Sequence, residues 1–246
     1  MARKSSAPRY DRRIGRWMGR NKLISLILVA ILAAAGWLWL QENPQHNPYA
    51  PLDLRDPLGW ATARKLSALS ADISACRAVL DRSDVAFRAL PAAGEGACER
   101  DDRTQLSNYP LAPDTPATTC PVAAALELWR TKTLDPVAQE IFGSSVASIE
   151  HLGAYSCRRM YGDENAPWSE HATANAIDIA GFVLADGRRV SLLEHWDGNE
   201  QERRFLRRAR DGACGVFATV LSPDYNAAHA DHFHLDQDAR WAGVCR

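Results

Sequence analysis

Two short stretches of the sequence concentrate residue types that bind metal ions or move protons. HADHFHLD, residues 229–236, contains three of the seven histidines in the chain. If it forms a strand, residues two positions apart share a face, so His232 and His234 lie together while Phe233 and Leu235 turn into the core. One imidazole could then bind a metal ion while its neighbour stands close enough to handle a proton.

The second stretch, SEHATANAID at residues 169–178, supplies further ligand types. His171 precedes Asp178 by seven residues, and Ile177 and Ile179 flank the aspartate. Isoleucines that face the core turn the Asp178 carboxylate to the opposite face of a strand. A carboxylate, a loop histidine and a strand histidine give three ligands with an open fourth position, as in catalytic zinc sites. Zinc there would lower the pKa of water to about 7 and polarise a carbonyl.

The elements that must position these residues change in character along the chain. Helical patterns at residues 59–83 and 120–132 precede a third helix that Asp135 and Pro136 open and Gly143 closes. Beyond Gly143, strand-like segments dominate, with Asp186-Gly187 as a hairpin turn and a helix at 199–212 that ends at Gly212. The order predicts an α+β domain, with an antiparallel sheet carrying the zinc site and helices mainly from the N-terminal half.

The N-terminus predicts a membrane anchor. Residues 1–22 carry a net charge of +7, and residues 23–40 are eighteen apolar or small residues with a single serine. The positive-inside rule places a basic cytoplasmic head at 1–22, a transmembrane helix at 23–41 and the rest in the periplasm, as a single-pass inner-membrane protein. A signal peptide cleaved after Ala33-Ala34-Ala35 is the alternative. Because residues 23–246 carry a net charge of −8, nucleic acid is excluded as a partner.

Residues 42–57 are rich in proline and predict a semi-extended tether that could reach about 50 Å from the membrane. The folded domain is then expected over 58–246. All six cysteines fall on the exported side, which predicts three disulfides. Neighbours in the sequence suggest the pairs 76–98, 120–157 and 214–245.

The pattern S-x-H-x-x-A-x-A-x-D followed by H-x-D-H-x-H resembles the zinc D-alanyl-D-alanine carboxypeptidases, the penicillin-insensitive murein endopeptidase and lysostaphin, which share a fold with the hedgehog signalling domain. Over nearly all of residues 47–246, the chain resembles more closely the bacterial extensin-like C-terminal domain family. The stretches that carry this resemblance are NPYAPLDLRDP, WATARKL, GAYSCR, SEHATANAIDIAGF and GVFATVLSPDYNAAHADHFHLD.

The resemblance implies a role for each site residue. His171, Asp178 and His234 match the three zinc ligands, and His232 matches the general base. His229 and Asp231 match positions that support the ligands. Arg158 matches a residue that polarises the scissile carbonyl or holds a substrate carboxylate, with Arg159 as the fallback. Two departures stand out, because the peptidases usually have glycine at the position of Ala174, and the carboxypeptidases have glutamate at the position of Asp231.

Three functions are compatible with these features. The first is a membrane-anchored zinc peptidase that hydrolyses D-Ala-type or cross-link bonds in peptidoglycan peptides. The second is a zinc-containing module that binds the cell wall, or serves a structural role there, without hydrolysis. The third is a cysteine hydrolase using Cys157 or Cys214, which the even number of cysteines in an exported domain disfavours.

Overall fold

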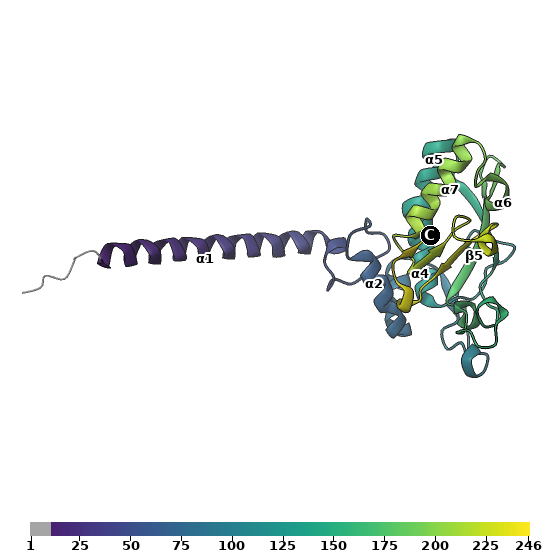
Figure 1. Ribbon diagram of the computed structural model, residues 1–246, viewed down its shortest axis with the longest axis horizontal. Helices are drawn as coiled ribbons and strands as arrows, with labels where there is room; N and C mark the ends of the chain where they lie inside the picture. The colour runs from purple at the N-terminus through teal and green to yellow at the C-terminus, as the bar shows by residue number, and fades with distance from the viewer. Residues whose placement is uncertain (1–10) are drawn as a thin grey trace, which may run out of the picture.

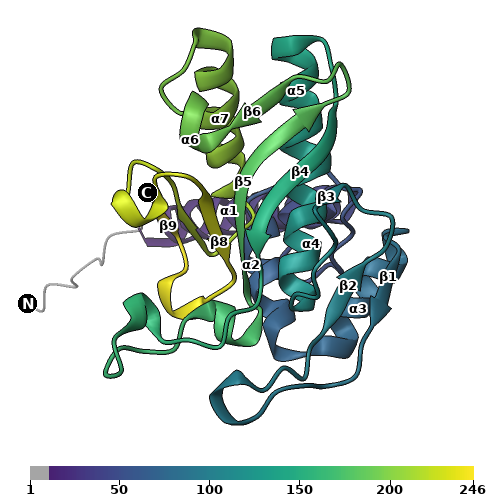
Figure 2. The ribbon, with the colours of Figure 1, turned by 90° about the vertical axis from the view of Figure 1, so that its right-hand side faces the viewer.

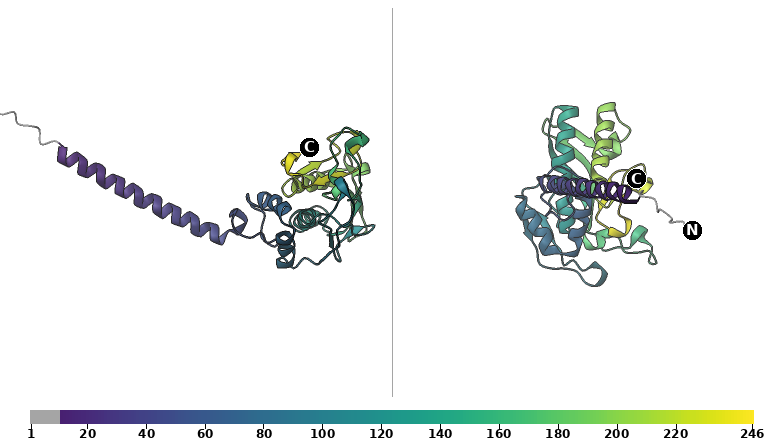
Figure 3. Two further views of the ribbon diagram at one scale, coloured as in Figure 1. Left: turned by 90° about the horizontal axis from the view of Figure 1, so that it is seen from below. Right: turned by 90° about the vertical axis from the view of Figure 1, so that its left-hand side faces the viewer.

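The computed structural model describes residues 11–246 and shows a long helix leading into an α+β domain (Figure 1). The long helix, α1, spans Asp11–Glu42, and its segment Asn21–Glu42 is long and apolar enough to cross a membrane. Length and composition fit a signal sequence equally well. The left view of Figure 3 shows α1 projecting away from the domain.

The domain is built from further helices and two sheets (Figure 2). The helices are α2 (Thr62–Ala68), α3 (Ile73–Arg82), α4 (Cys120–Trp129), α5 (Asp135–Phe142), α6 (Leu192–His195) and α7 (Glu200–Ala213). The small sheet pairs β1 (Phe87–Ala89) with β2 (Thr104–Leu106). The large sheet contains β3 (Leu111–Ala112), β4 (Val146–Gly153), β5 (Ala176–Leu184), β6 (Arg189–Ser191), β7 (Thr219–Leu221), β8 (Phe233–Asp236) and β9 (Val244–Cys245).

The large sheet has the order β3-β4-β5-β8-β7-β9, with β6 paired to β5 as well. Its central pairs are antiparallel, as predicted, but β3 runs parallel to β4 and β9 runs parallel to β7. The sheet is therefore mixed. The hairpin between β5 and β6 is confirmed, with Gly187 at a φ of 88° in the turn.

The core lies between one face of the sheet and the helices. Trp129 of α4 is fully buried and packs edge-to-face on Phe182 of β5, at 5.8 Å between ring centroids. Phe182 in turn meets Phe205 of α7 at 5.2 Å. The helices thus cover one face of β5, as the apolar positions of the sequence require, and leave the Asp178 face free for polar side chains.

Two predicted helix ends differ from the structure. α4 continues through a π-helical turn, η4 (Arg130–Leu134), directly into α5, so Asp135 lies inside a continuous helix and does not cap it. α7 runs past Gly212, where an added Cβ would lie 2.2 Å from Thr133 Cγ2. Glycine is needed there for the close approach of two helices. Gly143 does end α5 in the left-handed conformation.

The segment 42–57 also differs from the predicted tether. Leu52 and Leu54 are buried in the domain core, and Leu54 N donates a hydrogen bond to Ser83 Oγ at 2.9 Å. Arg82 Nη1 donates to the carbonyl of Leu52 at 2.9 Å. Apolar residues between the prolines find partners on α3, so much of this segment packs on the domain.

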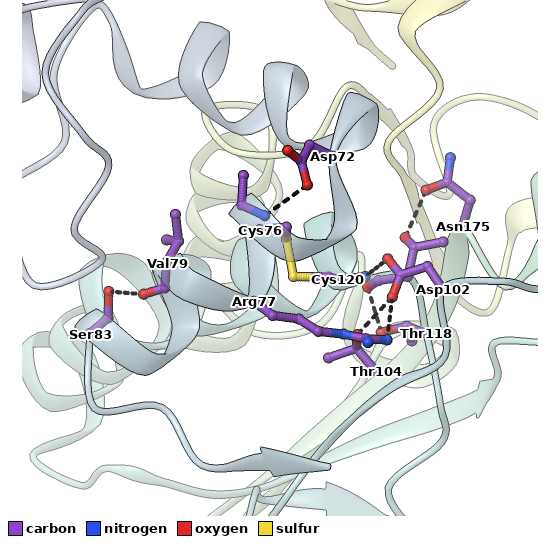
Figure 4. Close-up of a disulfide and its surroundings, with 12 residues drawn as sticks. Asp72, Cys76, Arg77, Val79, Ser83, Asp102, Thr104, Thr118, Cys120 and Asn175 are labelled. Carbon is purple, nitrogen blue, oxygen red and sulfur yellow. Dashed lines mark hydrogen bonds and ion pairs between the residues drawn. A yellow bond between two sulfur atoms is a disulfide. The ribbon is translucent and has the colours of Figure 1, made fainter. Parts of the chain in front are cut away.

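Three disulfides join the cysteines, but only one predicted pair is correct. The pairs are Cys76–Cys120, Cys98–Cys157 and Cys214–Cys245. The first joins α3 to α4, as Figure 4 shows, because these helices pack together although their cysteines are 44 residues apart. Asp102 lies beside this bond and accepts hydrogen bonds from Arg77, from Thr104 and from the backbone of Cys120. No cysteine is free for a catalytic role, which rules out the cysteine hydrolase.

Candidate metal centre

His171 is held by the short helical turn η6 (Glu170–Thr173) that precedes β5. Ser169 caps this turn by accepting a hydrogen bond from His171 N at 3.3 Å. The imidazole is buried, with Nδ1 at 3.0 Å from the carbonyl of Ala154. Because a carbonyl can only accept, Nδ1 carries the proton and Nε2 presents a lone pair to the site.

Asp178 and His234 lie directly opposite one another on neighbouring antiparallel strands, β5 and β8. Ile177, Ile179, Phe233 and Leu235 are all fully buried, which confirms the predicted alternation and places the polar side chains on the other face. Nε2 of His234 lies 3.0 Å from Asp236 Oδ2. That nitrogen therefore donates to the carboxylate, and His234 Nδ1 presents its lone pair to the site.

Three ligand-type atoms converge in this way. Nε2 of His171 lies 3.2 Å from Asp178 Oδ1 and 3.1 Å from His234 Nδ1, and the two latter atoms are 3.0 Å apart. The cluster His171, Asp178 and His234 could therefore hold a metal ion. Ligands about 2.0–2.1 Å from a tetrahedral zinc ion stand roughly 3.3 Å from each other, so the set is close to the spacing that zinc requires.

Zinc also fits the chemistry of these donors. Two neutral imidazoles and a carboxylate are ligands that zinc accepts readily, and each histidine is fixed by a hydrogen bond from its other nitrogen. Three lone pairs facing one point repel one another unless a proton or cation lies between them. The residues present thus fit a zinc ion.

The pKa shifts of Asp178 and His234 agree with a site that binds a positive charge. Burial would raise the pKa of Asp178, but hydrogen bonds with His171 and His234 outweigh it and lower the pKa below the ordinary aspartate value. Burial would lower the pKa of His234, but hydrogen bonds with Asp178 and Asp236 raise it to about 9. The carboxylate therefore stays ionised, and His234 retains a proton at neutral pH unless a metal ion replaces it.

His232 lies beside the three ligand atoms and just before β8. Its Nδ1 donates to Asp231 Oδ1 at 2.7 Å, and its Nε2 lies 3.6 Å from Asp178 Oδ1. Asp231 thus orients His232, leaving Nε2 free to accept or deliver a proton within the site. Asp231 does not contact a ligand.

His229 lies in the short turn η7 (Ala227–His229), with its ring centroid 5.2 Å from that of His232 and 6.0 Å from that of His234. Its Nδ1 pairs with Asn226 Oδ1 at 2.8 Å. Burial, followed by the charges of the two neighbouring histidines, lowers the pKa of His229 to about 4. It is therefore neutral at physiological pH and contacts the site through its ring.

A cavity of about 600 Å³ opens over the cluster. Arg158 lines it, whereas Arg159 donates to the carbonyl of Ala166 at 2.6 Å and lies 4.6 Å above the ring of Trp168. Arg159 therefore stabilises its own loop, whereas Arg158 lines the cavity together with Arg240 and Arg246. The wall also contains exposed aromatic side chains from three separate loops, namely Tyr161, Trp168, Tyr225 and Trp241.

Sequence reasoning missed Asp236 as the residue that fixes a ligand. It assigned the supporting role to His229 and Asp231, although Asp236 closes the same octet. Residues two apart on a strand share a face, so the spacing of His234 and Asp236 already contained the signal. Arg246 and Trp241 were also missed, because only β9, paired with β7 and held by the Cys214–Cys245 bond, brings the C-terminus to the cavity.

Ala174 ends the turn that carries His171. It adopts a φ of 58° and a ψ of 28°, the left-handed conformation that glycine tolerates best. Thr119, next to the Cys76–Cys120 bond, donates its backbone N–H to the carbonyl of Ala174 at 3.0 Å. Alanine in place of glycine therefore still allows a tight turn here, and the residue before α4 stabilises that turn.

The structure is that of an α+β protein with three disulfides and a candidate metal centre on the face of the sheet opposite the helices. The chain belongs to the extensin-like protein C-terminus family, whose model matches residues 74–246. No curated protein and no solved structure was found to match it.

Proposed function

We propose that this protein is a membrane-anchored, zinc-dependent peptidase that hydrolyses peptide bonds of peptidoglycan. The observation that carries the proposal is the convergence of His171 Nε2, Asp178 Oδ1 and His234 Nδ1 within 3.2 Å of one another, beside the oriented His232. The resemblance of both motifs to the zinc carboxypeptidases, the murein endopeptidase and lysostaphin supports the same reaction.

His171, Asp178 and His234 would hold the zinc ion. When bound there, zinc polarises a carbonyl group and acidifies water. His232 Nε2 takes a proton from the water that adds to the peptide carbonyl, and delivers it to the amine as the C–N bond breaks. Asp231 stabilises the imidazolium that exists between these two transfers, because its carboxylate accepts the Nδ1 hydrogen bond at 2.7 Å.

The remaining cavity residues would bind and orient the substrate. Arg158 can pair with a substrate carboxylate or a polarised carbonyl, as a guanidinium does well. Arg240 lies on the same wall, but its guanidinium is already paired with Asp238 and Glu170. Arg158 is therefore the better candidate for the ligand, and the aromatic wall supplies apolar contact area.

The surroundings support a site outside the cytoplasm. Three disulfides form and persist in oxidising compartments such as the bacterial periplasm. The apolar part of α1 follows a basic head, which favours an inner-membrane anchor with the domain in the periplasm. Peptidoglycan peptides are the substrates within reach there.

The test is digestion of purified peptidoglycan by the full chain, with and without a chelator, followed by mass spectrometry of the released peptides. We expect zinc-dependent cleavage, and we expect His232→Ala to bind zinc normally but lose about 10²–10⁴-fold in rate. His195→Ala is the matched control, because His195 lies in α6 and bonds to Ser191, outside the cavity. Zinc binding without cleavage of any wall fragment would instead support the non-hydrolytic cell-wall module.

A further inference from the structure

The junction between α1 and the domain is a set of specific contacts. Asn43 Nδ2 donates to the carbonyl of Trp39 at the end of α1, at 2.8 Å. In the turn η1 (Pro44–His46), the carbonyl of Pro44 accepts from Lys65 Nζ of α2 at 2.6 Å, and the carbonyl of Gln45 accepts from Ala61 N at 3.3 Å. The anchor is therefore joined to α2 with little free chain between them.

His46 reinforces this junction by stacking between two tryptophans. Its ring lies 5.2 Å from that of Trp39, at an interplanar angle of 15°, and 5.9 Å from that of Trp60, at 25°. Trp60 N donates to His46 Nδ1 at 3.4 Å. One tryptophan belongs to the membrane-length helix and the other to the domain, so the stack fixes their relative orientation.

Large apolar side chains of this stack and of its neighbours in the sequence are exposed. Tyr49 is 91% exposed and Trp60 is 65% exposed, with Trp39 and Leu58 also on the surface. Among the described residues after α1, the other exposed aromatic side chains have a contact or a cavity that explains them: four line the cavity at the metal centre, and Tyr155 lies 3.5 Å beneath the Arg100 guanidinium. Tyr49 has neither, and Trp60 stays 65% exposed although one face of its ring stacks on His46.

We propose that Trp39, Tyr49, Leu58 and Trp60 form a membrane-docking surface that sits in the headgroup layer of the bilayer entered by α1. Tryptophan and tyrosine favour this layer because their rings are apolar at one end and hydrogen-bonding at the other. The surface is continuous with the apolar helix, and Figure 1 shows α2 at the end of the domain from which α1 departs. This inference rests on the proposed anchoring by α1.

The docking surface changes which substrates the metal centre can reach. A semi-extended tether would let the site sample wall material about 50 Å from the membrane. A docked domain holds the site within one domain's thickness of the lipid surface, in a fixed orientation. The substrate class is therefore peptide stems in the layer next to the membrane.

Photo-crosslinking of the full chain in phosphatidylethanolamine–phosphatidylglycerol vesicles tests the docking. p-Benzoylphenylalanine is placed at position 60, at position 49 or at position 193, and lipid adducts are counted by intact-protein mass. Leu193 is the matched control, because it is 67% exposed, like Trp60, but lies in α6 on the side of the domain away from α1 (Figure 1). We expect several-fold more lipid adduct at positions 60 and 49 than at position 193.

Three outcomes would count against the docking, and they are distinguishable. If the chain stays with the vesicles after alkaline carbonate washing but all three positions give equal adducts, the anchor stands and the docking surface is wrong. If the washed vesicles release the chain, the proposed anchor fails and the docking fails with it. If only position 49 gives lipid adducts, the proposed placement of Trp60 in the headgroup layer is wrong.

Discussion

Two partly buried clusters of polar side chains lie in this domain, and their charges are balanced in opposite ways. Near the π-helical turn, Arg130 donates to Glu127 at 2.9 Å and to Asp135 at 3.1 Å, beside Tyr109. On the sheet, two imidazoles and one carboxylate converge. The first cluster places a cation between two anions, whereas the second directs three lone pairs at a single point.

The difference separates a cluster whose charges balance within the chain from one that can accept a cation. Burial raises the pKa of Glu127, but the adjacent guanidinium supplies the missing charge from within the chain. Nothing in the described part of the chain supplies a cation to Asp178 except a proton on a histidine, and the raised pKa of His234 is the result. The Arg130 cluster needs no ligand, but the histidine cluster is complete only with a proton or a metal ion.

The largest effect is expected from removing one partner of each cluster. His234→Ala should reduce zinc affinity by more than about 100-fold, because it deletes a ligand and not merely its support. Arg130→Met should leave one zinc per chain but lower the free energy of unfolding by about 1–3 kcal/mol, because Glu127 is left partly buried without a cation. Metal analysis and chemical denaturation measure the two quantities. Equal zinc content in His234→Ala and the wild type would refute the site.

The next effect concerns Asp236, which contacts His234 but no metal ion. Asp236→Asn should weaken zinc binding by about 10–100-fold. The neutral amide fixes the orientation of the His234 imidazole less well than the carboxylate does, and it makes the imidazole a less basic metal ligand. Asp231→Asn is the control, since Asp231 orients His232 alone and should slow turnover with unchanged zinc affinity. Competitive titration with a chromogenic chelator gives both affinities. Equal zinc affinities in the two variants would contradict the role of Asp236 in supporting His234.

An effect that is graded over several pH units is expected from pH. Between about pH 6 and pH 9, zinc must displace the proton that His234 holds, so the apparent zinc affinity should rise about tenfold per pH unit.

In the metal-free protein, the raised pKa of His234 stabilises the fold fully below pH 6.5, and this contribution is lost as pH rises through 9. The lowered pKa of Asp178 stabilises it above pH 3.8, and this is lost as pH falls. A zinc affinity that does not change from pH 6 to pH 9 would contradict the prediction that His234 is protonated in the metal-free protein.

The sequence predicts the local parts of this arrangement and not the long-range ones. The alternation around Asp178 and His234 determines which side chains face the core, because strand geometry has a period of two. The pairing of Cys76 with Cys120 depends on how α3 packs on α4, and no local pattern contains that information. Leu52 and Leu54 fall within the predicted tether for the same reason, since only the folded domain provides their partners.

Ala174 gives the smallest expected effect and tests whether the turn that carries His171 supports the candidate metal centre. Ala174→Gly removes a left-handed alanine that costs about 1–2 kcal/mol, but it also loses a buried methyl group and gives the unfolded chain more freedom. These contributions nearly cancel, so the free energy of unfolding should change by less than about 1 kcal/mol, with unchanged zinc affinity. Ala174→Val should instead destabilise the protein and weaken zinc binding, because a β-branched residue disfavours this conformation and shifts the turn that carries His171. If the valine variant binds zinc normally, the ligand set does not depend on this turn, and Ala174 is only a local feature of the backbone.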